Sequence, residues 1–182
     1  MTAAVIAALA SLIPLVVTAD AAEPPMSGEP APAVAEAPEQ LSEDAARSVL
    51  DGIYQGDFRT AFVDKRPELF LRHVPDDFVS TMVDGSRLDA TAIRQVFPQQ
   101  FATMARTIEH NVTIEDVDVL SKRSISGVVT LTTLIEHRRP GNGTFLVVTV
   151  GTFRDDFVLR NGVWMLRQAV QLRGQTITSP RP

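Results

Sequence analysis

Cysteine is absent from this chain of 182 residues. Disulfides, thiolate metal sites, a catalytic thiol and a lipid-modified cysteine at the N-terminus are therefore excluded. The three histidines, His73, His110 and His137, lie far apart and lack the spacing of a metal-ligand motif. We accordingly expect no metal site, and nothing in the sequence indicates a cofactor.

Positive charge is missing from the first part of the chain, because no Lys or Arg precedes Arg47. All 17 basic residues lie in the remainder, together with 15 of the 22 acidic ones. The net charge of -5 therefore arises from the N-terminal segment, and the rest is close to neutral. No basic run is interleaved with aromatic residues, which argues against a nucleic-acid partner.

Residues 1–22 have the pattern of a secretory signal peptide. Ala3 to Val17 is apolar but too short for a comfortable membrane span, and Ala19-Asp20-Ala21 fits a cleavage site of small residues. The pattern predicts an exported protein, periplasmic or secreted, cleaved after Ala21 or Ala22 and without a membrane span in the mature chain. The segment before the apolar run lacks Lys and Arg, so an uncleaved anchor and a misassigned start codon are the alternatives.

Residues 23–41 are rich in Pro, Ala and Glu and contain no aromatic residue. Such a segment buries too little apolar surface to offset its chain entropy, so it is predicted to be a disordered linker. We place one folded domain at residues 42–178 and a short tail at 179–182.

The domain begins with helical patterns. Ser42 is suited to cap a helix whose apolar residues follow helical spacing to Ile53, and Gly56 is expected to end it. Asp57 is then expected to cap a second helical piece, and a further short helix should end before Pro75.

Asp84-Gly85 lies between alternating segments and predicts a β-hairpin with a type I′ turn. A helix beginning at Asp89 or Thr91 should follow, with Pro98 as a possible kink. After residue 105 the apolar period changes to two, which predicts four long strands at residues 107–120, 123–137, 144–159 and 163–177. The first strand should present Ile108, His110, Val112 and Ile114 on one face. Gly127 and Gly151 are expected to be bend or bulge positions.

Helices followed by a long antiparallel sheet indicate an α+β fold. A sheet of this length can curve into a cone, with the N-terminal helices packed across its concave face and a pocket for a small apolar or amphipathic ligand inside. The outer face should carry Val128, Leu134, Val148 and Val150, which favours a homodimer formed through this face.

Three motifs, "GIYQGDFRTAF", "VDGSRLDATAIRQVF" and "DDFVLRNGVWMLRQAVQL", occur in this order. With the strand order, they resemble the nuclear transport factor 2-like superfamily, in its SnoaL-like and ketosteroid-isomerase-like branch. The resemblance covers about Ser42 to Thr178 and implies a cone-shaped, usually dimeric domain. Members include isomerases, dehydratases, cyclases and proteins without demonstrated catalysis, so it implies a pocket and not a particular reaction.

In the ketosteroid isomerases a general base lies in the first hairpin, and the matching residue here is Asp84. Their oxyanion donors are a Tyr of the first helix and a protonated Asp near the end of the sheet. The Tyr position falls near Val49, and Tyr54 is expected on a different side of the helix. The Asp is either Asp156, by counting back from the last turn, or Asp155, which shares a strand face with Phe153 and is favoured as the inward residue.

Each candidate also has a plain structural interpretation. Asp84 suits a hairpin turn, and His110 suits a hydrogen-bonded position at the edge of the core. We expect Tyr54, His110, Phe153 and Asp155 to line the pocket. The leading hypothesis is an exported domain that binds a small molecule or a protein without a defined catalytic centre. The alternative is an isomerase, dehydratase or cyclase using Asp84 or His110 as a base, with Asp155 assisting.

Overall fold

The structure, a computed structural model, describes residues 41–139, 141 and 143–180. The predicted signal peptide and nearly all of the predicted linker lie outside these residues. Leu41, the last linker residue, packs partly buried against the core, so the folded part starts at least one residue earlier than expected. Among the described residues, no helix has the length and apolar character needed to cross a bilayer.

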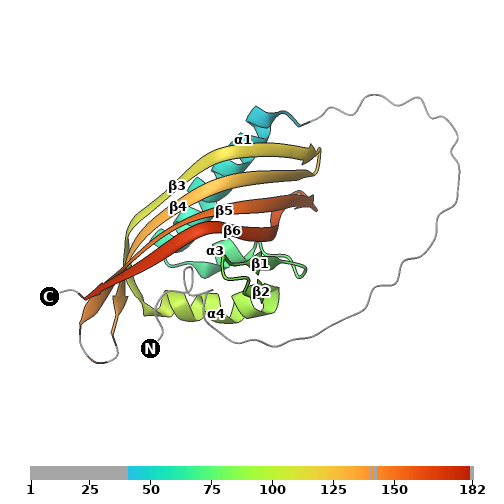
Figure 1. The fold of residues 1–182 in the computed structure, drawn as a ribbon. Helices are drawn as coiled ribbons and strands as arrows, with labels where there is room; N and C mark the ends of the chain where they lie inside the picture. The colour runs from blue at the N-terminus through green and yellow to red at the C-terminus, as the bar shows by residue number, and fades with distance from the viewer. Residues whose placement is uncertain (1–40, 140, 142, 181–182) are drawn as a thin grey trace, which may run out of the picture.

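One six-stranded sheet forms the body of the domain (Figure 1), in the order β2-β1-β6-β5-β4-β3. Its strands are β1 Val79–Thr81, β2 Arg87–Asp89, β3 Met104–Ser121, β4 Ser124–Arg138, β5 Thr144–Arg160 and β6 Val163–Pro180. The sheet is curved, and the helices lie on its concave side, which confirms the predicted α+β cone. The sheet is mixed and not wholly antiparallel, because β1 pairs with β6 in parallel.

The first helical region runs without a break through α1 Glu43–Asp51, the π-helix η2 Gly52–Phe58 and α2 Arg59–Val63. Ser42 caps α1, its hydroxyl accepting a hydrogen bond from the Ala45 amide at 3.2 Å. The predicted stop at Gly56 is wrong, because Gly56 lies within the wider turns of η2. Tertiary packing of the apolar face outweighs the weak helix propensity of glycine here.

The sequence suggested that Asp57 caps a helix. In the structure Asp57 instead connects the first helical region to the segment that follows α3. Its carboxylate lies 2.6 Å from His73 Nε2 and also accepts a hydrogen bond from Arg72, just after α3 Pro67–Leu71. Burial acts to raise the pKa of Asp57, but these hydrogen bonds outweigh it and the pKa is lowered. His73 Nδ1 donates to the Trp164 carbonyl at 2.7 Å, so the cluster also joins the helices to β6.

The predicted hairpin is formed by β1 and β2, and Asp89 caps α4 Ala90–Thr103 by accepting from the Ala92 amide at 2.8 Å. The turn is not of type I′, because Asp84 does not have a positive φ. The Gly85 amide instead donates to the Met82 carbonyl at 2.9 Å, which makes Val83 and Asp84 the central turn residues. Gly85 follows them with φ of 84°, a conformation that favours glycine.

Irregular pairing decides which residues of β3 face inward. The register shifts between Thr107 and Glu109, so Ile108 bulges out and is 46% exposed, whereas His110 is buried. The expectation that Ile108 shares a face with His110 is therefore wrong, and the bulge is the reason.

The two strand glycines allow close packing. The pairing of β4 with β5 has no register shift at either glycine, whereas the pairing of β5 with β6 shifts next to Gly151, between Thr152 and Phe153. A Cβ on Gly127 would lie 2.6 Å from Leu50 Cδ1, and one on Gly151 would lie 2.6 Å from Phe153 Cε2. Glycine at these positions therefore lets α1 and an inward aromatic ring approach the sheet.

Candidate functional site

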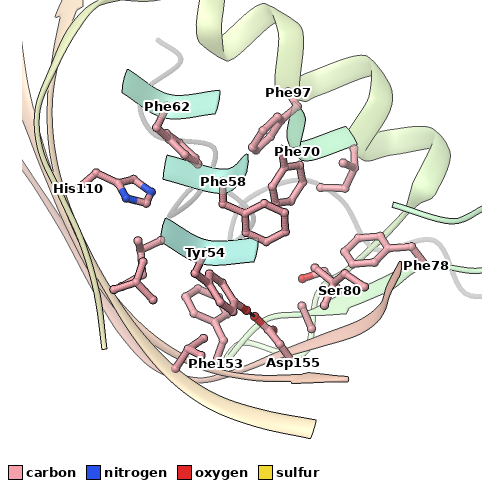
Figure 2. Close-up of a pocket in the computed structure, with 16 residues that line it drawn as sticks. Tyr54, Phe58, Phe62, Phe70, Phe78, Ser80, Phe97, His110, Phe153 and Asp155 are labelled. Atoms are coloured by element: carbon pink, nitrogen blue, oxygen red, sulfur yellow. Dashed lines mark hydrogen bonds between the residues drawn. The ribbon is translucent and has the colours of Figure 1, made fainter. Parts of the chain in front are cut away.

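A cavity of about 100 Å³ lies between the helices and the concave face of the sheet (Figure 2). Aromatic and aliphatic side chains dominate its lining. The lining residues are Tyr54, Phe58, Phe62, Phe70, Phe78, Ser80, Ile93, Phe97, His110, Val112, Val129, Leu131, Phe153, Asp155, Leu166 and Ala169. All four residues that the sequence suggested for a pocket are among them.

The first helical region supplies one wall of the cavity. Tyr54 and Phe58 from η2 and Phe62 from α2 point into it one above the other (Figure 2). The sequence placed Tyr54 on a different side of the helix from Val49, and the structure puts Tyr54 on the face of Leu50, which points toward the sheet. The helix buries Leu50 completely, and Tyr54 follows it by four residues, which places both on one face. This spacing of four, continued by Phe58 and Phe62, is the sequence signal that could have located Tyr54.

Tyr54 and Asp155 form a hydrogen-bonded pair at one end of the cavity (Figure 2). The phenol hydroxyl donates to Asp155 Oδ2, and both side chains are buried. Burial raises the pKa of Asp155 to about 7, although the hydrogen bond from Tyr54 acts in the opposite direction. Burial and the neighbouring carboxyl also raise the pKa of Tyr54 well above its usual value. Asp155 therefore exchanges its proton near neutral pH, where an ordinary aspartate is fully ionised.

The pleat of β5 settles which aspartate faces the cavity. Asp155 points inward, whereas Asp156 accepts a hydrogen bond from the Ser126 hydroxyl at 2.7 Å on the outer face. Strand parity from Phe153 thus gave the correct residue, and counting back from the turn did not.

His110 lies beside Phe62 on the side of the cavity away from Asp155 (Figure 2), with ring centroids 4.9 Å apart. Its side chain is 7% exposed, and burial lowers its pKa to about 4, so the imidazole is neutral at physiological pH. Within the described part of the chain, His110 Nδ1 and Asp155 Oδ1 have no hydrogen-bond partner. Two unsatisfied polar atoms therefore belong to residues lining an otherwise apolar space.

Asp84 is not brought to this cavity. Its Oδ1 accepts hydrogen bonds from the Ser86 amide at 2.9 Å and the Ser86 hydroxyl at 2.6 Å, on an exposed turn. These hydrogen bonds lower its pKa, which is opposite to what a base in a water-poor pocket would show. The expectation that Asp84 could act as a pocket base is corrected: the side chain serves the turn.

Nothing in the described residues forms a cluster of three or more metal-binding side chains. His73 and His137, the histidines outside the cavity, have other contacts. His73 lies against Asp57, and His137 Nδ1 is 3.0 Å from the Thr103 hydroxyl at the end of α4. Both histidines thus tie helices to the sheet.

Comparisons with known proteins show the fold. No family model matches the sequence, and none of the curated proteins does. Among solved structures, a putative scytalone dehydratase from Novosphingobium aromaticivorans is similar, with a TM-score of 0.58 and 11% identity over 76% of this chain and 87% of that one. A type 2 hexachlorocyclohexane dehydrochlorinase, LinA, has a TM-score of 0.55 and 17% identity over 76% and 90%.

An NTF2-like protein of unknown function from Prochlorococcus marinus also aligns, with a TM-score of 0.53 and 15% identity over 74% of this chain and 95% of that one. The chain therefore has the nuclear transport factor 2-like fold, as the sequence motifs suggested. The structural similarity establishes the fold, but at sequence identities this low it leaves the activity open.

Proposed function

We propose that this domain binds a small, largely apolar molecule in the cavity between Tyr54, His110 and Asp155. The observation that carries the proposal is the pair of buried polar atoms, His110 Nδ1 and Asp155 Oδ1, that no described residue satisfies. Buried polar groups are nearly always hydrogen-bonded, and an unpaired one is costly. A bound molecule with a hydroxyl or carbonyl group would satisfy at least one of them.

The surroundings of Asp155 favour recognition of a ligand hydroxyl group as well as a ligand carbonyl group. Since Tyr54 already donates to Oδ2, the proton of the acid form belongs on Oδ1, where it can be donated to a ligand oxygen. The ionised form can instead accept a hydrogen bond from a ligand hydroxyl. Gly127 and Ala169 flank Asp155 in the sheet, so no large side chain from a neighbouring strand covers it.

Binding is tested with 4-fluorophenol as the probe, followed by broadening of its ¹⁹F NMR signal. We expect broadening with the wild-type domain and roughly tenfold weaker binding for Asp155→Leu, because one hydrogen bond is lost. Asp156→Asn, a change on the outer face of the same strand, is the matched control and should leave the affinity unchanged. Equal binding by both variants would refute a role of the cavity.

A second candidate function is proton transfer on a bound carbonyl compound, as in an isomerase or dehydratase. This function is favoured by two shifted pKa values in one cavity. The pKa of Asp155 is raised to about 7, where a histidine usually titrates, and the pKa of His110 is lowered to about 4, where an aspartate usually titrates. Such pairs are common where one group acts as an acid and the other as a base. In this scheme His110 removes a proton next to the carbonyl, while Asp155 donates a hydrogen bond to the oxygen as negative charge develops.

The scheme is tested by incubating 3-cyclohexen-1-one with the domain and following the conjugated isomer by its ultraviolet absorbance. We expect His110→Ala to abolish any conversion that the wild type catalyses. Absence of conversion by the wild type above the buffer rate, with 4-fluorophenol still bound, would leave a binding protein without this chemistry.

Export and dimerisation complete the proposal. The signal-peptide pattern supports export. The intact mass of the protein purified from its native host should correspond to a chain without residues 1–21 or 1–22.

Dimerisation is supported by the outer face, where Leu134, Val148 and Ile177 lie side by side on paired strands and Ile177 is 53% exposed. Sedimentation velocity should show a dimer that Val148→Glu converts to a monomer.

A further inference from the structure

The size of the cavity limits what can occupy it. Its volume of about 100 Å³ is smaller than the roughly 150 Å³ of an engineered apolar cavity that takes up benzene. Pockets for drug-sized ligands are larger, roughly 300–1,000 Å³. Even a single six-membered ring would therefore fill the cavity completely, and a fused-ring molecule would have to displace much more of the wall.

Several of the walls resist displacement because their aromatic rings support one another. Phe97 lies 4.4 Å from Phe70, 4.9 Å from Phe101 and 5.9 Å from Phe62, measured between ring centroids. These rings come from α2, α3 and α4, so moving one of them disturbs the packing between three helices. Such closely packed aromatic clusters expand only at a cost in contact energy.

The charge of the lining limits the ligand as well. No Lys or Arg is present among the described residues that line the cavity, and the lining groups that can carry a charge are Tyr54, His110 and Asp155. His110 is neutral there, and Asp155 becomes negative when ionised. A carboxylate or phosphate would lose its hydration without gaining a cation, so charged anions are disfavoured.

We infer that the ligand is a molecule without negative charge, no larger than a single six-membered ring with a short polar substituent. This inference rests on the proposed binding function and narrows it. The size limit distinguishes this cavity from a cavity of the same fold that accommodates fused-ring compounds.

The test compares four fluorinated probes by ¹⁹F NMR: fluorobenzene, 4-fluorophenol, 4-fluorobenzoate and 6-fluoro-2-naphthol. We expect the single-ring phenol to bind at least tenfold more tightly than the two-ring naphthol and the benzoate. Equal or tighter binding of the naphthol or the benzoate would overturn the inference while leaving the binding function standing. Failure of all four probes to bind would overturn both, and thereby mark the failure of the proposed function itself.

Substitutions at two lining positions, Ala169 and Phe153, test the size limit from opposite directions. Ala169→Leu adds atoms to the lining and should weaken 4-fluorophenol at least tenfold, whereas Val170→Leu, next to it on the other face of β6, should not. Phe153→Ala removes a lining ring and should admit the naphthol, and Phe153→Leu serves if the alanine variant does not fold. Naphthol affinity that is the same in the wild type and in either folded Phe153 variant would contradict the size limit.

Discussion

Asp84 and Asp155 carry the same side chain in opposite settings. Asp84 lies on the exposed turn between β1 and β2, where hydrogen bonds from Ser86 lower its pKa. Asp155 lies in the middle of β5, where burial raises its pKa to about 7 although Tyr54 donates a hydrogen bond to it. Asp84 therefore remains ionised above about pH 4, whereas Asp155 exchanges a proton near neutrality.

The difference shows that the chemistry of a carboxyl group follows from what surrounds it and not from the motif that contains it. The Asp84-Gly85 pair is the more conspicuous in the sequence because it marks a turn, and a turn is by nature exposed. No local pattern marks the raised pKa of Asp155, which depends on burial beneath a helix about a hundred residues earlier in the chain.

The largest expected effect is on how stability depends on pH. The pKa of Asp155 is about 7 in the folded protein and near 3.8 in the unfolded chain, so its stabilising contribution is complete below about pH 4 and is lost as the pH rises through about 7. This loss is on the order of 4 kcal/mol. Urea unfolding between pH 4 and pH 8 should therefore show Asp155→Asn gaining stability relative to the wild type as the pH rises.

Asp84→Asn provides the contrast in the same experiment. Because the pKa of Asp84 is lowered, its contribution is present at neutral pH and disappears as the pH falls below 3.8, the ordinary pKa of an aspartate. This variant should show no relative gain between pH 4 and pH 8. If the wild type and Asp155→Asn differ by a constant amount over that range, the assigned contrast between the two aspartates is wrong.

Removing the partner of Asp155 is expected to have the next largest effect. Tyr54→Phe deletes the hydroxyl that donates to Oδ2 and should destabilise the domain by about 1–3 kcal/mol. It should also raise the pKa of Asp155 further, because this hydrogen bond lowers it. Urea unfolding and a ¹³C NMR titration of the Asp155 carboxyl measure the two effects.

Ser126→Ala is the matched control, since it removes the donor to Asp156 on the outer face. Ser126 is buried but Asp156 is only half-buried, so water can replace that donor and the loss of stability should be smaller. A Tyr54→Phe variant no less stable than Ser126→Ala would show that the buried pair is not energetically distinct.

A smaller effect is expected at the turn. Gly85→Ala places a side chain at φ of 84° and should cost about 1 kcal/mol. Gly56 has a helical backbone, and a Cβ added there would meet open space. Gly56→Ala should therefore stabilise the domain by about 0.5–1 kcal/mol. Changes of opposite sign in the free energy of urea unfolding would support the distinction between a glycine that its backbone conformation requires and one that it does not. Equal losses would contradict it.

The smallest effect is expected for Asp84→Ala. It removes hydrogen bonds on a solvated turn and should lower the urea midpoint by less than Gly85→Ala does. The affinity for 4-fluorophenol should not change. A clear loss of binding would return Asp84 to the functional site and break the comparison.

Much of the fold could be predicted because its signals are local. Ser42 and Asp89 cap helices as expected, Asp84-Gly85 marks the expected hairpin though not the expected type of turn, and the four long strands follow the period of two. The parallel pairing of β1 with β6 was not predicted, since it joins segments about ninety residues apart and leaves no pattern in either.

The site was predicted in part for the same reason. Strand parity identified Asp155 as inward, because alternation is a property of a single strand. The hydrogen bond between Tyr54 and Asp155 was missed because the tyrosine position of the related isomerases was assigned near Val49, whereas packing aligns the helix on Leu50. The outward turn of Ile108 follows from a bulge in β3, which an alternating sequence does not reveal.

The arrangement of the sheet also bears on how the protein avoids aggregation. Its order places β3, with 18 residues, at one end and β2, with three, at the other. A long open edge could recruit strands of other molecules, but the register of β3 shifts at four places and exposed acidic residues, including Glu115 and Asp118, lie along it. The bulges that orient His110 toward the cavity thus also make this edge a poor template for a foreign strand.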